Sequence, residues 1–502
     1  MKTSIRWHAI LFAILLFSAG TASAQPQPLE SFDDYVAKAV RDWEVPGLAI
    51  AVVKDGQVVF SKGYGVRKLG KPDLVDRQTL FAIGSTTKAM VAASIGMLVD
   101  EGKLGWNDPV TNHLPDFQLY DPYVTREVTV RDLLTHRAGL GNADFLWYGQ
   151  EATRQDILHR LRYLPPQTSM RSHFTYQNIM YTAAGEVVAE ASGVAWEQFL
   201  RRRLFEPLGM NSSVALLAET RGRPNVASPH DRVDGAIKVI KNASVDPVAP
   251  AGSVWSSVED MAKWMVFLLE GQPTLLEDET RADLFKPQFI VGDSFYPTKR
   301  LTRPHWTTYG SGWFQQDYDG RAVDFHTGSI DGMVAIIGLI RDERLGVYVL
   351  GNLDHAEVRH ALMYRVFDHY GGGSVRDWSA ELKELYGNLH SEAVSRMKKV
   401  EDERVPETAP TFPLEEYAGT YSDPLYGTIE VTYDGKLSIR YGPGFEGELE
   451  HWHYDTFRAR WDAKWRGTLL VAFHMDAKGR PSTLMAGGGA FTREETTDVN
   501  SR

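Results

Sequence analysis

Apolar runs of two lengths alternate along the first three quarters of the chain. Leu80 to Gly84 is a short run that predicts a strand, whereas Lys88 to Val99 is long enough for a helix and contains no proline. Ile179 to Glu190 is another apolar run of helical length. Met333 to Ile340 and Leu345 to Leu350 are apolar and separated by a charged turn, which predicts a β-hairpin. This part of the chain therefore combines strands with helices.

The pattern changes after the glycine run Gly371 to Gly373. Trp378 to Val400 has helical length but is densely charged, and the proline-rich segment Val405 to Pro413 predicts a linker. We therefore expect residues 373–412 to form a charged helix and linker, and residues 413–496 to form a small antiparallel β-barrel domain. The short strand-like runs of this last domain are Thr428 to Tyr433, Leu437 to Tyr441, Thr456 to Trp461 and Thr468 to Met475.

The N-terminus has the arrangement of a cleavable secretory signal. Lys2 and Arg6 precede the apolar run Ile10 to Phe17, which is followed by the small residues Ala22 to Ala24. We predict that residues 1–24 are a signal peptide, that no stable membrane anchor remains after its cleavage, and that the protein is periplasmic or secreted. The absence of cysteine excludes a lipid-modified cysteine, a disulfide framework and a thiol nucleophile.

Composition narrows the classes of partner. The formal net charge is -11 over 502 residues, without long acidic blocks, which argues against nucleic acid as a partner. The length predicts more than one domain, with a main domain over residues 25–372.

The strongest candidate for chemistry is the pair Ser85 and Lys88, at the predicted transition from strand to helix. Residues three apart share one face of a helix, so the lysine amine can reach the serine hydroxyl. We expect Ser85 to cap the helix, where backbone N–H groups could also stabilise an oxyanion. The same Ser-x-x-Lys spacing recurs at Ser395 and Lys398, in a charged helix that cannot desolvate the amine, and we discard that copy.

Two further groups of polar residues follow at wide intervals. Tyr176 and Asn178 precede the helix-length run from Ile179, where the phenol could accept a proton and the amide could bind a substrate carbonyl or hold Lys88. A second Tyr-x-Asn, Tyr386 and Asn388, lies in the discarded charged helix.

The third group is His326-Thr327-Gly328-Ser329, on a predicted strand near the sheet edge. A glycine at that position would leave room for a substrate backbone to pair with the edge. A single histidine beside a strand is more often a packed, hydrogen-bonded core residue, and that alternative stays open from this motif alone.

As an ordered set, these motifs resemble the penicillin-binding protein and class C β-lactamase-like family of serine hydrolases. The resemblance covers most of the chain between about Leu29 and Gly371. It implies an α/β (α+β) fold of the β-lactamase/transpeptidase type: an antiparallel sheet flanked by helices, plus an all-helical subdomain. Other stretches typical of the family are Val45 to Leu48 with the turn Asp55-Gly56, Leu133 to Leu140 and Phe205 to Met210.

The resemblance also implies roles for individual residues. Ser85 would be the nucleophile that forms an acyl-enzyme, and Lys88 and Tyr176 would share its proton, with the immediate base undecided. Asn178 would position substrate or Lys88. The backbone N–H groups of Ser85 and Ser329 would form the oxyanion hole, and His326, Thr327, Gly328 and Ser329 would bind substrate. No cofactor and no metal is implied.

His326 stands where many family members have lysine, whose fixed charge suits a substrate carboxylate. The His-x-Gly variant resembles D-aminopeptidases and β-lactamase-like serine peptidases. We therefore expect hydrolysis of peptides or other amides, with an esterase or a β-lactamase as alternatives. A non-hydrolysing penicillin-binding or peptidoglycan sensor and an inert scaffold also stay open, as does a homo-oligomer.

The last domain resembles the lipocalin-like domain appended to some of these hydrolases, and we hypothesise that it closes the cleft or shapes specificity. His451 and His453 share one face of a strand, but without cysteine or an obvious third ligand we expect packing and surface hydrogen bonds there, not a metal site. We interpret Trp452, Trp461 and Trp465 as filling the barrel.

Overall fold

The computed structural model describes residue 29 and residues 31–292, 295–372 and 376–495. The predicted signal peptide, residues 1–24, lies outside the described residues. Within the described part of the chain, none of the helices combines the length and the apolar character that a bilayer span requires.

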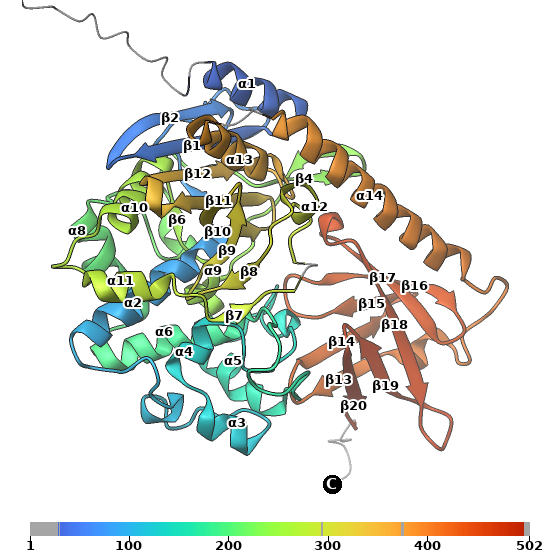
Figure 1. The fold of residues 1–502 in the computed structure, drawn as a ribbon. Coiled ribbons are helices and arrows are strands. Elements are labelled where there is room, and N and C mark those ends of the chain that lie inside the picture. The colour runs from blue at the N-terminus through green and yellow to red at the C-terminus, as the bar shows by residue number, and fades with distance from the viewer. Residues whose placement is uncertain (1–28, 30, 293–294, 373–375, 496–502) are drawn as a thin grey trace, which may run out of the picture.

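A fully antiparallel sheet of eight strands forms the centre of the first domain (Figure 1), in the order β2-β1-β12-β11-β10-β9-β8-β7. The predicted hairpin is confirmed as β11 and β12, which pair from Val334 and Gly351 to Ile340 and Leu345. The strands are β1 (Gly47–Lys54), β2 (Gln57–Gly65), β7 (Phe289–Ile290), β8 (Thr307–Tyr309), β9 (Phe314–Tyr318), β10 (Arg321–Ile330), β11 (Met333–Ile340) and β12 (Leu345–Gly351).

Alternate residues of the central strands enter two different cores. Ile50 and Val349 pack toward α1 (Phe32–Asp42) and α13 (Val358–Gly371) on one face. Ala51 and Tyr348 face the other side, which is covered by α10 (Val258–Glu270) and α2 (Lys88–Asp100). Because both faces are buried, β1, β11 and β12 are almost continuously apolar and do not alternate with polar residues.

A mostly helical region packs beside the sheet, around α2 and α6, and the predicted fold is confirmed. The predicted helix from Ile179 is α6, which begins at Asn178. The other helices and short strands of the first domain are α3 (Pro122–Glu127), α4 (Val130–Leu134), α5 (Arg154–Arg160), α6 (Asn178–Ser192), α7 (Trp196–Leu200), α8 (Glu206–Leu208), α9 (Ala249–Gly252), α11 (Asp278–Leu284), α12 (Lys299–Thr302), β3 (Phe81–Ala82), β4 (His230–Val233), β5 (Ala236–Val239) and β6 (Trp255–Ser256).

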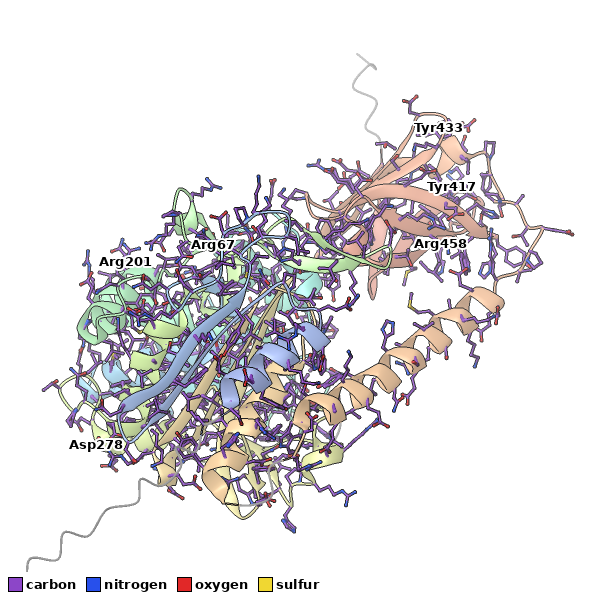
Figure 2. All side chains as sticks on the ribbon, turned by 90° about the horizontal axis from the view of Figure 1, so that it is seen from above. Arg67, Arg201, Asp278, Tyr417, Tyr433 and Arg458 are labelled. Carbon is purple, nitrogen blue, oxygen red and sulfur yellow. The ribbon has the colours of Figure 1, made fainter. Side chains whose placement is uncertain are left out.

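The charged helix is confirmed as α14 (Trp378–Asp402), which leads from the first domain to a closed eight-stranded antiparallel barrel. In Figure 2 the barrel, with Tyr417, Tyr433 and Arg458, lies beside the first domain and apart from Arg201 and Asp278. The strands are β13 (Gly419–Asp423), β14 (Gly427–Tyr433), β15 (Leu437–Arg440), β16 (Glu446–His453), β17 (Thr456–Trp461), β18 (Thr468–Met475), β19 (Pro481–Ala486) and β20 (Gly489–Arg493).

Buried aromatic side chains fill the barrel, including Tyr417, Phe457 and, as predicted, Trp461. The prediction was wrong for Trp465, whose indole N–H leaves the barrel and donates to Asp331 of the first domain at 3.2 Å. Trp452 is buried against the barrel, beneath the guanidinium groups of Arg404 and Arg458.

Both histidines of the barrel, His451 and His453, form hydrogen bonds with backbone groups of the protein. The Nδ1 atom of His453 accepts a hydrogen bond from the Val405 N–H at 3.3 Å. His451 Nε2 lies 2.9 Å from the Tyr454 carbonyl oxygen.

Candidate active site

Ser85 lies in a tight 3₁₀ turn, Gly84–Thr87, between β3 and α2. The predicted strand Leu80 to Gly84 is shorter than expected: Phe81–Ala82 pairs with β6, and Leu80 forms an isolated bridge to Val226. The prediction that Ser85 caps the helix was wrong: Thr87 occupies the N-cap position of α2. The Ser85 hydroxyl instead accepts a hydrogen bond from Lys88 Nζ at 3.0 Å. The turn frees the hydroxyl from a capping role.

Lys88 is fully buried, and its amine has three acceptors within hydrogen-bond distance. Besides Ser85 Oγ, Nζ donates to Asn178 Oδ1 and to the Ala251 carbonyl, both at 2.8 Å. Burial lowers the pKa of Lys88 to about 7, while the Asp144 carboxylate opposes this shift. A substantial fraction of this amine is therefore neutral near pH 7, and a neutral amine has a lone pair that can accept the serine proton.

Asn178 links the lysine to a carboxylate that no sequence motif indicated. Its side-chain oxygen accepts from Lys88, and its Nδ2 donates to both carboxylate oxygens of Asp144, at 3.0 and 3.1 Å. The indole N–H of Trp147 donates to the same carboxylate at 3.0 Å. Of the two roles left open for Asn178, the structure therefore shows contact with Lys88. Asp144 lies in a loop without a motif, and only the fold brings it here.

Tyr176 lies directly above the amine, with its ring centroid 4.9 Å from Lys88 Nζ. Burial raises the pKa of Tyr176 well above its usual value, and a side-chain hydrogen bond with Ser85 offsets part of that shift. The phenol is therefore protonated near neutral pH, where it can donate a proton but cannot readily accept one.

His136 supports Tyr176 from behind. Its ring centroid lies 4.3 Å from that of Tyr176, and its Nδ1 accepts from the Gln177 N–H at 3.0 Å. The residue has φ of 56°, a left-handed conformation that is uncommon outside glycine but that histidine adopts more often than most residues. His136 lies in the stretch Leu133 to Leu140, whose pattern indicated the fold but no chemical role.

His326 is a buried, neutral residue, only 1% exposed. Burial lowers its pKa to about 3, and the neighbouring Lys88 charge contributes to the shift. Its Nδ1 lies 2.6 Å from the Thr327 carbonyl and its Nε2 lies 3.3 Å from the Tyr309 hydroxyl. The imidazole thus offers no fixed positive charge to a substrate.

Tyr296 and Arg359 hold the next residues of β10 in place. Thr327 Oγ1 is 2.9 Å from the Tyr296 hydroxyl, and the Ser329 side chain is exposed. The buried guanidinium of Arg359 donates through Nη1 to the Gly328 carbonyl at 2.5 Å and to Ser329 Oγ at 2.9 Å. Arg359 therefore fixes the strand just where it passes the Ser85 turn.

Gly328 makes room for the protein's own backbone beside Ser85. A Cβ at this position would lie 1.9 Å from the Ile83 carbonyl oxygen and 3.1 Å from the Ser85 nitrogen. That the glycine also admits a substrate at the strand edge stays a prediction. A Cβ on Gly84 would likewise lie 2.6 Å from the Ser329 nitrogen. The two glycines therefore let the Ser85 turn and β10 approach closely, which brings the backbone N–H groups of Ser85 and Ser329 together.

One edge of β10 is open beside this site. The pairing of β10 with β9 ends at Phe325, whereas the pairing with β11 continues to Ile330. The edge from His326 to Ile330 and the Asp144–Asn178 side thus form two walls around Ser85 and Lys88.

The model of the family described as Beta-lactamase matches residues 32–369, more than half of the chain. The chain belongs to the β-lactamase family. This is a family of serine hydrolases, and the resemblance found from the motifs is confirmed. A second model, described only as a domain of unknown function (DUF3471), matches residues 403–495, which include the barrel.

Named relatives include the unguisins hydrolase ungD of Aspergillus violaceofuscus, which is 29% identical over 508 residues and aligns with 92% of this chain and 88% of the relative. The octameric penicillin-binding protein homologue from Pyrococcus abyssi has a similar fold, with a TM-score of 0.62, 21% identity and coverage of 92% of this chain and 98% of the other. The structure of SurE matches with a TM-score of 0.56, 22% identity and coverage of 93% and 99%.

Proposed function

We propose that this protein hydrolyses amide bonds of peptides through an acyl-enzyme on Ser85, with Lys88 as the base. The observation that carries the proposal is the buried Lys88 amine, whose pKa is lowered to about 7 and whose Nζ lies 3.0 Å from Ser85 Oγ. A base with a pKa near the working pH combines a useful neutral fraction with a useful affinity for the proton.

In the proposed reaction, neutral Lys88 takes the proton of Ser85 as Oγ attacks the substrate carbonyl carbon. The negative charge that develops on the carbonyl oxygen is stabilised by the backbone N–H groups of Ser85 and Ser329. Tyr176, protonated because burial raises its pKa, donates a proton to the leaving amine and recovers one from Lys88. Water then attacks the ester on Ser85 with the same groups, which releases the acid and restores the serine.

Asn178 and Asp144 are proposed to hold the base. The amide fixes the position of Lys88 Nζ, and the carboxylate keeps the pKa of Lys88 from falling further in its buried environment. Without that carboxylate, the lysine would be a weaker base.

Peptides are favoured over esters, and esters over β-lactams. Burial holds the pKa of His326 at about 3, so this position carries no positive charge for a β-lactam carboxylate near neutral pH. One relative is named as a hydrolase of unguisins, and SurE has also been determined with D-Leu, with a TM-score of 0.54 to this chain. We therefore include peptides that contain D-amino acids among the proposed substrates.

Export and assembly also belong to this proposal. Residues 1–24 would direct the chain to the periplasm or the medium, as predicted from their pattern. The octameric state named for the Pyrococcus abyssi homologue supports a homo-oligomer.

Labelling with a fluorophosphonate probe tests the acyl-enzyme directly. The wild-type protein should become labelled on the peptide that contains Ser85, with a rate that rises with pH through about 7 as Lys88 loses its proton. Ser85→Ala should not be labelled. Labelling at another residue, or none in wild type, would refute the proposal. Incubation with L- and D-amino-acid peptides, short esters and a chromogenic cephalosporin then ranks the substrates, and a stable adduct without turnover would identify a sensor instead.

A further inference from the structure

The carboxylate of Asp331 joins three parts of the molecule at one end of the site. Asp331 lies in the turn between β10 and β11, two residues after Ser329. It accepts hydrogen bonds from the Tyr148 hydroxyl, from the Trp465 indole at 3.2 Å and from Arg466 Nη2 at 3.4 Å. Tyr148 belongs to the loop that follows Asp144, whereas the other two donors belong to the barrel domain.

The hydrogen bond from Tyr148 to Asp331 crosses from one wall of the site to the other. Tyr148 is anchored on the side of Asp144 and Asn178, because its backbone N–H donates to the Asp144 carbonyl at 2.8 Å. Asp331 terminates the opposite wall, the open edge of β10. Burial raises the pKa of Tyr148, and the Asp331 charge adds to this shift, so the phenol remains a donor.

The barrel domain contacts both residues of this hydrogen bond, Tyr148 and Asp331, through Arg466. The Arg466 guanidinium lies against two rings that meet edge to face, 4.4 Å from the Tyr148 centroid and 4.5 Å from that of Phe445. It pairs with Asp331, and the two side chains are only 8% and 10% exposed. A pair so shielded from water is screened little by salt and holds its geometry firmly.

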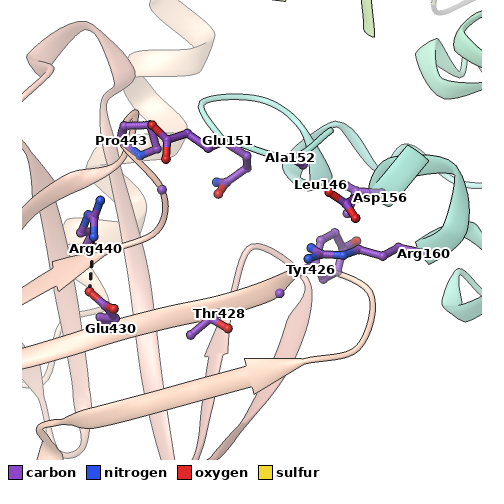
Figure 3. Close-up of a pocket in the computed structure, with 13 residues that line it drawn as sticks. Leu146, Glu151, Ala152, Asp156, Arg160, Tyr426, Thr428, Glu430, Arg440 and Pro443 are labelled. Atoms are coloured by element: carbon purple, nitrogen blue, oxygen red, sulfur yellow. Dashed lines mark ion pairs between the residues drawn. The ribbon is translucent and has the colours of Figure 1, made fainter. Parts of the chain in front are cut away.

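The barrel also fixes the loop that carries Tyr148. The Tyr441 hydroxyl donates to the Phe145 carbonyl at 2.8 Å, and the two rings stack with centroids 4.3 Å apart. The Gly444 N–H donates to the Gly149 carbonyl at 2.9 Å. Beyond these contacts, the loop and the barrel leave a polar cavity of about 300 Å³, lined by Gln150, Glu151, Arg160, Tyr426 and Arg440 among others (Figure 3).

We propose that Tyr148 and Asp331 form a bridge that closes one end of the substrate cleft, and that Arg466 of the barrel positions it. The inference rests on the proposed function, because it concerns a peptide lying at Ser85. A strand advances about 3.3 Å per residue, so Asp331, in the turn two residues after Ser329, lies at most roughly 6 to 7 Å from Ser329. A peptide paired with the open edge advances equally and therefore has room for about two residues on this side. The substrate class is peptides cleaved near one end, and the protein is an exopeptidase.

Fluorogenic alanine peptides test the bridge. They contain one cleavable amide and are lengthened from one to four residues on either side of it, in L and D series. For wild type, kcat/KM should fall at least tenfold, mainly through KM, when one side exceeds two residues, whereas lengthening the other side should have little effect. Tyr148→Phe, which lacks the bridging hydroxyl, and Arg466→Ala should both reduce that discrimination to less than threefold.

Matched variants distinguish a role of Arg466 in positioning the bridge from a general loss of protein stability. Arg466→Lys keeps the charge and should restore part of the discrimination that Arg466→Ala loses. Lys436→Ala removes an exposed barrel ion pair with Glu448 and should behave as wild type. If Arg466→Ala does not fold, Tyr148→Phe decides alone, because its ring still packs on Arg466.

Fluorophosphonate labelling distinguishes failure of this inference from failure of the proposed function. Wild type that is labelled on Ser85 but cleaves long and short peptides equally well on both sides would overturn the bridge alone. Unchanged length discrimination in Tyr148→Phe and Arg466→Ala would do the same. Absence of labelling in wild type would overturn both.

Discussion

Ser85 and Lys88 share their residue types and helical spacing with Ser395 and Lys398, but their surroundings differ in every respect that matters for chemistry. Lys88 is fully buried and hydrogen-bonded to Ser85, and its pKa is lowered to about 7. Lys398 is 73% exposed and pairs with Asp402 at 2.7 Å. Ser395 Oγ donates back to the Ser391 carbonyl of its own helix.

This comparison separates proximity from activation. Spacing alone brings an amine and a hydroxyl to one face of a helix at both places. Only burial removes the water that would keep the amine charged. Of the two helices that carry this spacing, α2 is surrounded by core on all sides, whereas α14 is largely exposed. The two Tyr-x-Asn copies differ at the asparagine: Asn178 contacts Lys88, whereas Asn388 is exposed on α14. Burial raises the pKa of Tyr386 as it does that of Tyr176, so the phenols alone do not distinguish the copies.

The largest difference in activity is expected between the variants that lack the Ser85 hydroxyl and the Ser395 hydroxyl. Ser85→Ala should lower kcat by about five to six powers of ten, because no acyl-enzyme can form. Ser395→Ala should leave kcat and KM unchanged. Steady-state hydrolysis of the best peptide substrate measures both variants. If both variants lost kcat to a similar extent, burial of the Ser-x-x-Lys pair would not be what makes a copy active.

The variants that lack the Lys88 amine and the Lys398 amine should differ in kcat/KM by nearly as much. Lys88→Met keeps a long unbranched side chain in this buried position but removes the base, and kcat/KM should fall by about three to four powers of ten, without the rise through pH 7. Lys398→Met should match wild type, because that amine is charged and exposed. Thermal melting checks that both variants are folded. A Lys88→Met enzyme with an unaltered pH profile would exclude the lysine as base.

The carboxylates near the two amines sharpen the comparison further. Asp144 favours the ammonium form of Lys88 and raises its pKa against burial. In Asp144→Asn this effect is lost, so the pKa falls and the acidic limb of kcat/KM should move to lower pH, by up to about one unit. The plateau rate should fall roughly tenfold because the base is weaker. Asp402→Asn is the control, and a limb that moves to higher pH would contradict the expected direction of the shift.

The smallest effect on the pH profile is expected at His326. Because its pKa is lowered to about 3, the imidazole does not change charge between pH 5 and 8. His326→Asn should lower kcat only several-fold through lost packing, and the acidic limb should stay within about 0.3 pH units of wild type. A pH-rate series on purified variants decides this. Movement by a full unit would show that His326 titrates in the working range.

Elements with a strong periodic pattern were predicted well. The hairpin β11–β12, the helices α2, α6 and α14, and an antiparallel barrel after Pro413 were all expected and found. Their apolar spacing is a local property, so the sequence carries it directly. The spans of the signal peptide and of the domains stay predictions.

Within the site, the predicted residues of the three motifs lie together, but the residues that hold Asn178 and Tyr176 in place were not predicted. Asp144 and His136 carry no periodic or spacing signal, and loops bring them to Asn178 and Tyr176. Ser85 was expected to cap α2, but a preceding 3₁₀ turn takes the chain into the helix. Trp465 was expected to fill the barrel, whereas its indole N–H donates to Asp331 of the first domain.

The order of motifs determined the family and the nucleophile to test. The change of pattern after Gly371 to Gly373 determined the presence of a second domain. Both are properties of residue type and spacing along the chain. Only the tertiary structure decided how far burial lowers the pKa of Lys88, which groups hold a proton near neutral pH, and that barrel residues lie against the walls of the site. The physical reason is that burial and electrostatic coupling depend on distances between segments far apart in sequence, and these distances exist only after folding.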